Sequence, residues 1–158
     1  MINGVCIRRR HRVKHIILLF MVIASTLNLY SQQGWPIRVC RELRIGDRYK
    51  DGLVIAINNQ RKSVTISTTR PIGSGGWNEA DKICRNYVLN GYPWRMPSRT
   101  ELLTIFSLKQ YLDGYENNWY WTNQYRGNSA LHIGIVARDE AYVPKEHGKL
   151  VFAVTEIY

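Results

Sequence analysis

Two β-rich runs begin the part of the chain that has a clear hydrophobic pattern. Residues 53–57 and 63–67 are rich in Val, Ile and Thr, and the polar run 58–62 between them has the length of a hairpin connection. Residues 32–45, which precede them, show no clear period, and we interpret them as a leader or linker. The pattern therefore predicts a β-hairpin near the start of the domain.

A first helix is predicted by apolar residues that recur at the spacing of one buried helix face. These residues are Trp77, Ala80, Cys84, Tyr87 and Val88. The glycine-rich residues 73–76 before them are expected to form a flexible lead-in. Residues 90–91, Asn-Gly, have the residue types of a helix stop.

A second, short helix is predicted to begin at Ser98. Ser98 and Glu101 have the S-x-x-E spacing of a capping box, in which hydroxyl and carboxylate each satisfy a backbone N–H. Pro97 and Leu102 occupy the two positions of a hydrophobic staple. We therefore predict that the residues around the box are structural rather than ligand-binding: Trp94, Met96, Pro97 and Leu102.

Strands are predicted again after the two helices. Residues 131–136 alternate as in a half-buried strand, residues 138–140 are typical of a turn, and residues 149–157 are predicted to form a final strand. Strands, two helices and strands again indicate an α+β fold rather than a parallel α/β sheet.

Length and charge limit the classes of function. A chain of 158 residues suits one domain, and its 45% apolar and 22% charged composition is that of a globular protein. The formal charge of +10 includes five basic groups and no acid in residues 1–31, which leaves 17 basic and 12 acidic groups in the remainder. Because these are dispersed, we predict no nucleic-acid partner.

Residues 1–31 are predicted to be a signal peptide. A basic stretch leads into an apolar run at residues 16–24, which is shorter than the roughly 20 apolar residues of a transmembrane helix. We therefore expect export to the periplasm, outer surface or extracellular space. The alternative is an uncleaved anchor, so that a membrane is a partner only through this segment.

The predicted export determines which cysteines remain and whether they can form a disulfide. Cys6 would leave with the signal, whereas Cys40 and Cys84 would remain. Cys84 is either bonded to Cys40 in an oxidising compartment or is a buried free thiol.

Four motifs in order carry a resemblance to a known family. Residues 94–102, Trp-Arg-Met-Pro-Ser-Arg-Thr-Glu-Leu, resemble the W-R-L-P-S/T-x-x-E-L signature of a bacterial surface-domain family. This family is the Lcl C-terminal-like domain, close to the Fibrobacter-type major paralogous domain. The opening at 46–54, the Trp77-to-Cys84 helix and the strand at 119–122 are also similar to it. The resemblance covers about residues 46–158.

The resemblance implies a C-type-lectin-like fold, with two helices, small antiparallel sheets and long loops. In such a fold the first and last strands pair, and long loops project from a second sheet. Relatives often pair the helix cysteine with one in the terminal strand, but Ala153 stands at that place here.

Few patterns of catalytic or metal chemistry are present in the sequence. It has no Gly-rich phosphate loop, H-E-x-x-H or CxxC, nor the acidic loop that calcium-dependent lectins use. We therefore predict no cofactor and no metal. An enzyme with Cys84 as nucleophile and His132 or His147 as base is the least favoured alternative, since Cys84 lies on the apolar face of a helix.

Residues 111–128 are the predicted recognition segment, because they combine aromatic residues with asparagines. A strand hides only alternate side chains, so Tyr120, or else Trp119 and Trp121, should face outward. The alternative is that both tryptophans are core and the loop is idle. The predicted contact set is Tyr115, Asn117, Asn118, Tyr120, Asn123, Tyr125 and Arg126.

These patterns together predict a secreted or cell-surface binding module without enzymatic activity. Its ligand would be a protein or a glycan, held by the aromatic and Asn-rich loops without calcium. A structural subunit of a surface assembly, with these loops buried against a partner chain, is the alternative.

Overall fold

The structure is a computed structural model that describes residues 42–158. The predicted signal peptide, most of the predicted linker, Cys6 and Cys40 lie outside the described residues. Residues 43–158 form one compact unit. Among residues 42–158, no helix is long and apolar enough to cross a membrane.

The first sheet contains the predicted hairpin. Its antiparallel strands, in spatial order, are β1 (Arg48–Tyr49), β2 (Gly52–Asn58), β3 (Ser63–Ser67) and β9 (Val154–Ile157). The resemblance implies that the first and last strands pair, but β1 and β9 share this sheet without pairing. β9 pairs with β3 because the short β1 lies on the far side of β2.

The second sheet holds five strands. In spatial order they are β4 (Gly73–Gly75), β8 (Lys149–Val151), β5 (Trp119–Arg126), β6 (Ser129–Gly134) and β7 (Glu140–Pro144). All pairs are antiparallel except β5 and β8, which meet in parallel at Tyr120 and Leu150. The expected flexible lead-in at 73–76 is thus largely a strand, because β8 supplies it with a partner.

The predicted final strand at 149–157 is two strands in two different sheets. Phe152 and Ala153 carry the chain from β8 to β9, and both are fully buried. The backbone N–H of Ala153 donates to Thr68 Oγ1 at 3.2 Å, and the N–H of Thr68 donates to the carbonyl of Ala153 at 2.9 Å. These two bonds satisfy the backbone where the ladder is interrupted.

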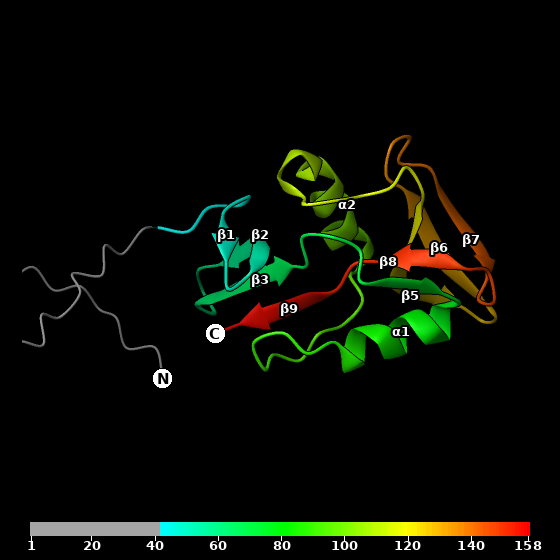
Figure 1. Ribbon diagram of the computed structural model, residues 1–158, viewed down its shortest axis with the longest axis horizontal. Helices are drawn as coiled ribbons and strands as arrows, with labels where there is room; N and C mark the ends of the chain where they lie inside the picture. Colours follow the sequence, from blue (N-terminus) through cyan, green and yellow to red (C-terminus); the bar gives the residue numbers. More distant parts are fainter. Residues whose placement is uncertain (1–41) are drawn as a thin grey trace, which may run out of the picture. The chain divides into compact units, whose positions relative to one another are not determined.

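The two helices lie on opposite sides of the central strands (Figure 1). They are α1 (Trp77–Asn86) and α2 (Arg99–Ser107), and a 3₁₀ turn, η1 (Lys109–Tyr111), follows α2. Helix α1 ends earlier than its pattern predicts, because Tyr87 has extended backbone angles. The expectation that Val88 is buried is therefore wrong, and its side chain is 85% exposed.

The predicted capping box is present at the start of α2. The Glu101 N–H donates to Ser98 Oγ at 3.3 Å, and the Ser98 N–H donates to Glu101 Oε2 at 2.8 Å. Arg95 adds a two-pronged ion pair to the same carboxylate, at 2.6 and 2.8 Å. Burial alone would raise the pKa of Glu101, but Arg95 and Ser98 outweigh it and lower the pKa. Arg95, Ser98 and Glu101 therefore form one structural unit.

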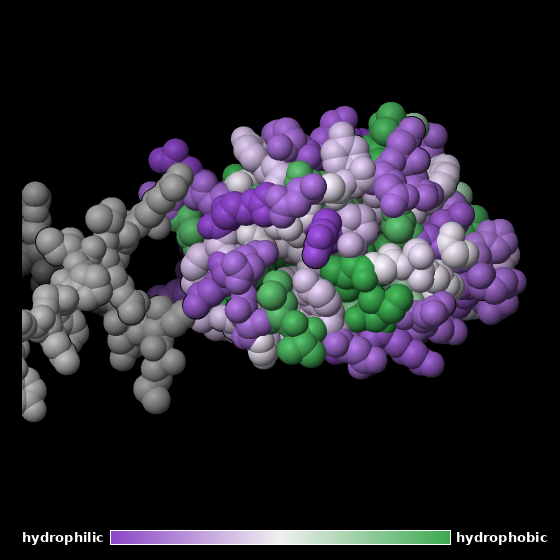
Figure 2. All heavy atoms as spheres, in the orientation of Figure 1, coloured by the Kyte–Doolittle hydropathy of each residue, from purple (hydrophilic) through white to green (hydrophobic). Residues whose placement is uncertain are grey.

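The core consists of two clusters, one on each side of the second sheet. One includes Cys84 of α1, Trp94, Met96 and Trp121. The other includes Phe106 of α2, with Tyr120 and Phe152. Adjacent residues of β5 thus enter different clusters. Figure 2 shows one face of the molecule, where hydrophilic residues prevail and apolar residues gather in a few separate patches.

Candidate functional site

Tyr120 is fully buried, which corrects the expectation that its side chain faces outward as a contact residue. Its ring packs edge-on against Phe106 and stacks on Phe152, with centroids 5.4 and 5.2 Å away. Trp121, on the opposite face of the strand, is fully buried as well. The expectation assumed one solvent-facing side. Both faces of β5 are covered instead, so consecutive residues are both core.

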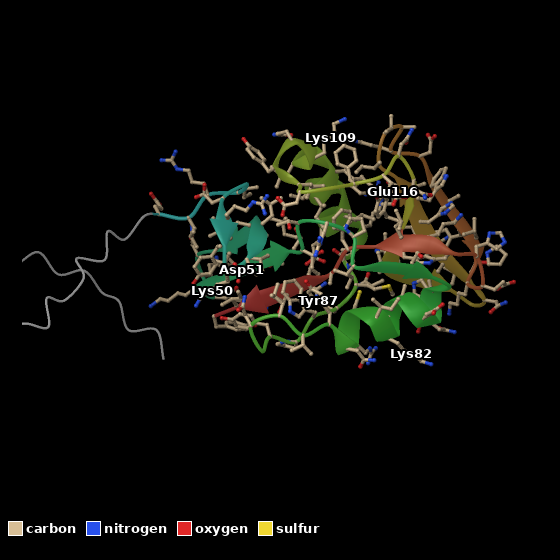
Figure 3. The ribbon with its side chains drawn as sticks, viewed as in Figure 1. Lys50, Asp51, Lys82, Tyr87, Lys109 and Glu116 are labelled. Carbon is tan, nitrogen blue, oxygen red and sulfur yellow. The ribbon has the colours of Figure 1, made fainter. Side chains whose placement is uncertain are left out.

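Tyr120 nevertheless acts on the loop that precedes it. Its hydroxyl donates to the backbone carbonyl of Glu116 at 2.9 Å and accepts from the Glu116 N–H at 3.0 Å. Burial raises the pKa of Tyr120, so the hydroxyl stays protonated and able to donate. Figure 3 shows Glu116 on the loop between α2 and β5. Tyr120 is a positioning residue for this loop.

The start of the same loop is fixed by Asp113. Its backbone N–H donates to the carbonyl of Thr69 at 2.8 Å, and its carboxylate accepts from Thr69 Oγ1 at 2.5 Å. Arg48 donates to both carboxylate oxygens, at 2.6 and 3.0 Å. The Arg48 guanidinium lowers the pKa of Asp113 to about 2, so the carboxylate keeps its charge. The loop is therefore held at Asp113 and again at Glu116.

A groove of about 440 Å³ lies against this loop. Tyr115 and Glu116 line it from the loop, Arg70 lies before β4 and Ser74 within it, and Leu150 of β8 contributes an apolar side chain. Tyr115 is 43% exposed. The residues that line the groove thus carry a guanidinium, a carboxylate, hydroxyls, an aromatic ring and an apolar side chain.

A smaller hollow of about 210 Å³ lies further along the same loop. Asn117, Asn118 and Trp119 line it together with Gly134 and Asp139. The backbone carbonyl of Asn118 accepts from the N–H of Ile135 at 3.3 Å, which ties the loop to the end of β6. Three predicted contact residues, Tyr115, Asn117 and Asn118, therefore lie on one anchored segment beside two hollows.

Behind the smaller hollow lies a buried histidine. The half-buried ring of Trp119 stacks on His132 with centroids 4.2 Å apart and planes 16° apart. Burial lowers the pKa of His132 to about 4, with the charges of Lys149 and His147 acting in the same direction. His132 is thus neutral near pH 7. Its Nδ1 has no hydrogen-bond partner among the described residues.

The other predicted contact residues lie at the far end of β5. Asn123, Tyr125 and Arg126 are exposed there, separated from Asn118 by most of an eight-residue strand, or roughly 20 Å. The pairing of β5 with β6 is irregular between Trp121 and Tyr125. The exposed residues of the predicted contact set therefore lie on two separate surfaces rather than on one.

Sequence patterns missed several residues of both surfaces. Arg70, Ser74 and Leu150 reach the groove from segments distant in the sequence, and no local motif marks them. Trp77 was assigned to the buried face of α1, but its ring is only partly buried and lies 5.0 Å from that of Tyr125. Lys145 also was not predicted, although its ammonium lies 4.0 Å from the Tyr125 ring.

Cys84 is a buried free thiol in the structure, whose Sγ lies 3.7 Å from the carbonyl oxygen of Phe152. Burial raises its pKa to about 12, and the nearby charge of Asp81 adds to the effect. Because the thiolate is the reactive form, this environment suits a core residue rather than a nucleophile. In the described part of the chain, no group of three or more His, Cys, Asp or Glu side chains is arranged to hold a metal ion.

Comparisons with known proteins gave a structural likeness at low sequence identity but no family. No protein-family model matches the sequence, and no curated protein matches it. The chain is similar to the crystal structure of botrocetin, with 10% sequence identity and a TM-score of 0.44, over 70% of this chain and 100% of that one. The predicted α+β class is present in the structure itself, as two helices and two small sheets. Nothing about a ligand or a partner follows from this likeness.

Proposed function

We propose that this chain is an exported or cell-surface binding module, which recognises a neutral glycan in the groove beside Tyr115 without calcium and without catalysis. The observation that supports the proposal most directly is the groove itself, which lies against a segment whose composition is that of recognition loops. The family resemblance of the four sequence motifs supports the surface location.

The polar groups of the groove suit hydroxyl-rich ligands. Arg70 can only donate hydrogen bonds, the Glu116 carboxylate can only accept them, and the Ser74 hydroxyl does both. A sugar hydroxyl both donates and accepts, so it can satisfy each of these groups. Because the opposite charges of Arg70 and Glu116 offset each other, the groove favours a neutral ligand.

The apolar groups of the groove suit the C–H surfaces of a sugar. The Tyr115 ring and Leu150 offer flat and rounded apolar surfaces, which can cover the C–H faces of a pyranose ring. A volume of about 440 Å³ is within the range of small-molecule sites. The loop is already held at Asp113 and Glu116, so little ordering would be needed when a ligand binds.

An array of immobilised neutral oligosaccharides, probed with the full-length protein in the presence of a calcium chelator, tests the proposal. We expect binding to a subset of the array, with a loss of about tenfold or more in affinity for Tyr115→Ala and for the Arg70→Gln, Glu116→Gln double variant. Tyr125→Ala, which removes a more exposed tyrosine at the far end of β5, is the control. Unchanged binding by folded Tyr115→Ala and double-variant proteins would refute the site.

A further inference from the structure

The tip of the β5–β6 hairpin and the end of β7 form a second surface, here named the tip surface. It consists of Trp77, Tyr125, Arg126, Tyr142 and Lys145. The Lys145 ammonium lies 4.0 Å from the centroid of the Tyr125 ring and 4.8 Å from that of Trp77. The Arg126 guanidinium lies 4.4 Å from the centroid of the Tyr142 ring. Two cations are thus held on aromatic rings beside one hairpin.

In the described part of the chain, neither of these two cations is paired with a carboxylate. The structure pairs four other arginines with carboxylates: Arg48, Arg85, Arg95 and Arg99. Within residues 42–158, neither Arg126 nor Lys145 forms such an ion pair, although Glu146 follows Lys145 directly. Glu140, at the other end of β7, is engaged by Arg99 at 2.7 Å. A cation on an aromatic face is partly desolvated but still charged, so the tip surface favours an anionic partner.

The backbone at Lys145 is fixed on both sides. Its N–H donates to the carbonyl of Asn128 in the hairpin turn at 3.1 Å, and its carbonyl accepts from the N–H of Trp77 at 2.7 Å. The indole N–H of Trp77 donates to the carbonyl of Thr122 at 2.8 Å. The turn, the start of α1 and β5 therefore hold Trp77 and Lys145 in place. A partner would meet a surface that is already ordered.

An edge strand adjoins the two cations. β7 ends the order of the second sheet and, among residues 42–158, pairs with β6 alone (Figure 1). An edge strand presents backbone N–H and C=O groups to which an extended peptide can add as a further strand. Tyr142 is 37% exposed and Tyr125 is 59% exposed, which gives such a peptide aromatic contact area.

We propose that the tip surface binds an extended acidic segment of a partner protein, which lies along β7 and places its carboxylates against Arg126 and Lys145. The edge strand favours a peptide over other anions, since it offers main-chain hydrogen bonds. Two cations are few for a nucleic-acid backbone or an anionic membrane, which are recognised by larger basic clusters. This surface is separate from the groove at Tyr115, so the chain would engage two different ligands.

The test uses the full-length protein and an N-acetylated Glu-Thr-Glu-Thr-Glu-Thr peptide, with a Gln-Thr repeat of equal length as the neutral control. Binding is followed by the NMR shifts of the Tyr142 and Lys145 amides during titration. We expect millimolar or tighter binding that weakens with added salt. The Arg126→Gln, Lys145→Gln double variant should bind about tenfold more weakly.

The matched control variant is Arg61→Gln with Lys109→Gln, which removes the same charge from exposed positions elsewhere. It should bind the acidic peptide like wild type. Three results would overturn the proposal: equal binding by the tip variant and wild type, equal binding of the Gln-Thr peptide, or absence of binding at roughly 5 mM peptide. Tighter binding of a sulfated oligosaccharide of the same charge would also overturn it, because the partner would then not be a peptide. Glycan binding at Tyr115 should be unchanged in the tip variant.

Discussion

The buried Tyr120 fixes the backbone of Glu116, because its hydroxyl donates one hydrogen bond to that backbone and accepts another from it. A residue that cannot touch a ligand thereby fixes the conformation of the loop that lines both hollows. Removal of the hydroxyl alone separates its hydrogen bonds to Glu116 from the packing of the ring. The ring would keep its contacts with Phe106 and Phe152.

Tyr120→Phe should lower the free energy of unfolding by about 1–2 kcal/mol, because a backbone donor and a backbone acceptor lose their partner. Hydrogen exchange at the Glu116 amide should become faster. Urea unfolding and exchange measured by NMR provide the two readouts. Tyr125→Phe, at an exposed site, is the control. Unchanged protection of Glu116 would contradict the anchoring role.

Ser98→Ala should lower the free energy of unfolding by about 1 kcal/mol, since the Glu101 N–H at the start of α2 loses its acceptor. Ser98→Thr keeps a hydroxyl and should recover most of the loss. Denaturant unfolding followed by circular dichroism measures both variants. A Thr variant as unstable as the Ala variant would show that the hydroxyl is not the cause.

Acid should weaken the fold through His132. The unfolded chain binds a proton at His132 near its ordinary pKa of 6.5, whereas the folded chain does so only near 4. The free energy of unfolding should therefore fall as the pH drops from about 6.5 towards 4, by up to roughly 3 kcal/mol from this residue. The measurement is urea unfolding across this range for wild type and His132→Phe.

The His132→Phe protein should have a shallower pH dependence, whatever its stability at pH 7. Identical slopes for wild type and His132→Phe would mean that other groups cause any loss of stability in acid.

Cys84 should resist thiol reagents in the native protein at pH 8, because its side chain is buried and its pKa is about 12. It should react fully in denaturant. Mass spectrometry of the tryptic peptide that contains Cys84 distinguishes it from the other cysteines. Rapid native labelling of that peptide would reopen the possibility of a reactive thiol.

Local patterns predicted the parts of the fold that depend on local physics. The capping box of Ser98 and Glu101 needs residues only three positions apart, and it is present as predicted. Strand β4 depends on β8, some 75 residues later in the chain, so a Gly-Ser-Gly run alone could not predict it. Burial of Tyr120 likewise depends on α1 and α2 covering both faces of β5, which alternation along one strand does not reveal.

Some residues of the candidate sites could likewise be predicted from local sequence, and others could not. Tyr115, Asn117 and Asn118 were predicted from one run of aromatic residues and asparagines, and they do lie together beside the two hollows. Arg70 and Lys145 reach these surfaces through tertiary contacts. Their own sequence surroundings carry no sign of this, because charged residues in polar segments are usually only solvated.

The short crossing between β8 and β9 joins a wall of the groove to the C-terminal strand. Leu150, part of the groove, lies two residues before Phe152, and β9 begins directly after Ala153. Phe152 and Ala153 are both buried and connect the two strands directly, so we expect this segment to extend little when β9 is displaced. Tension applied to the C-terminal strand would therefore be transmitted along the covalent chain to a wall of the groove. We therefore expect a load on β9 to change the shape of the groove.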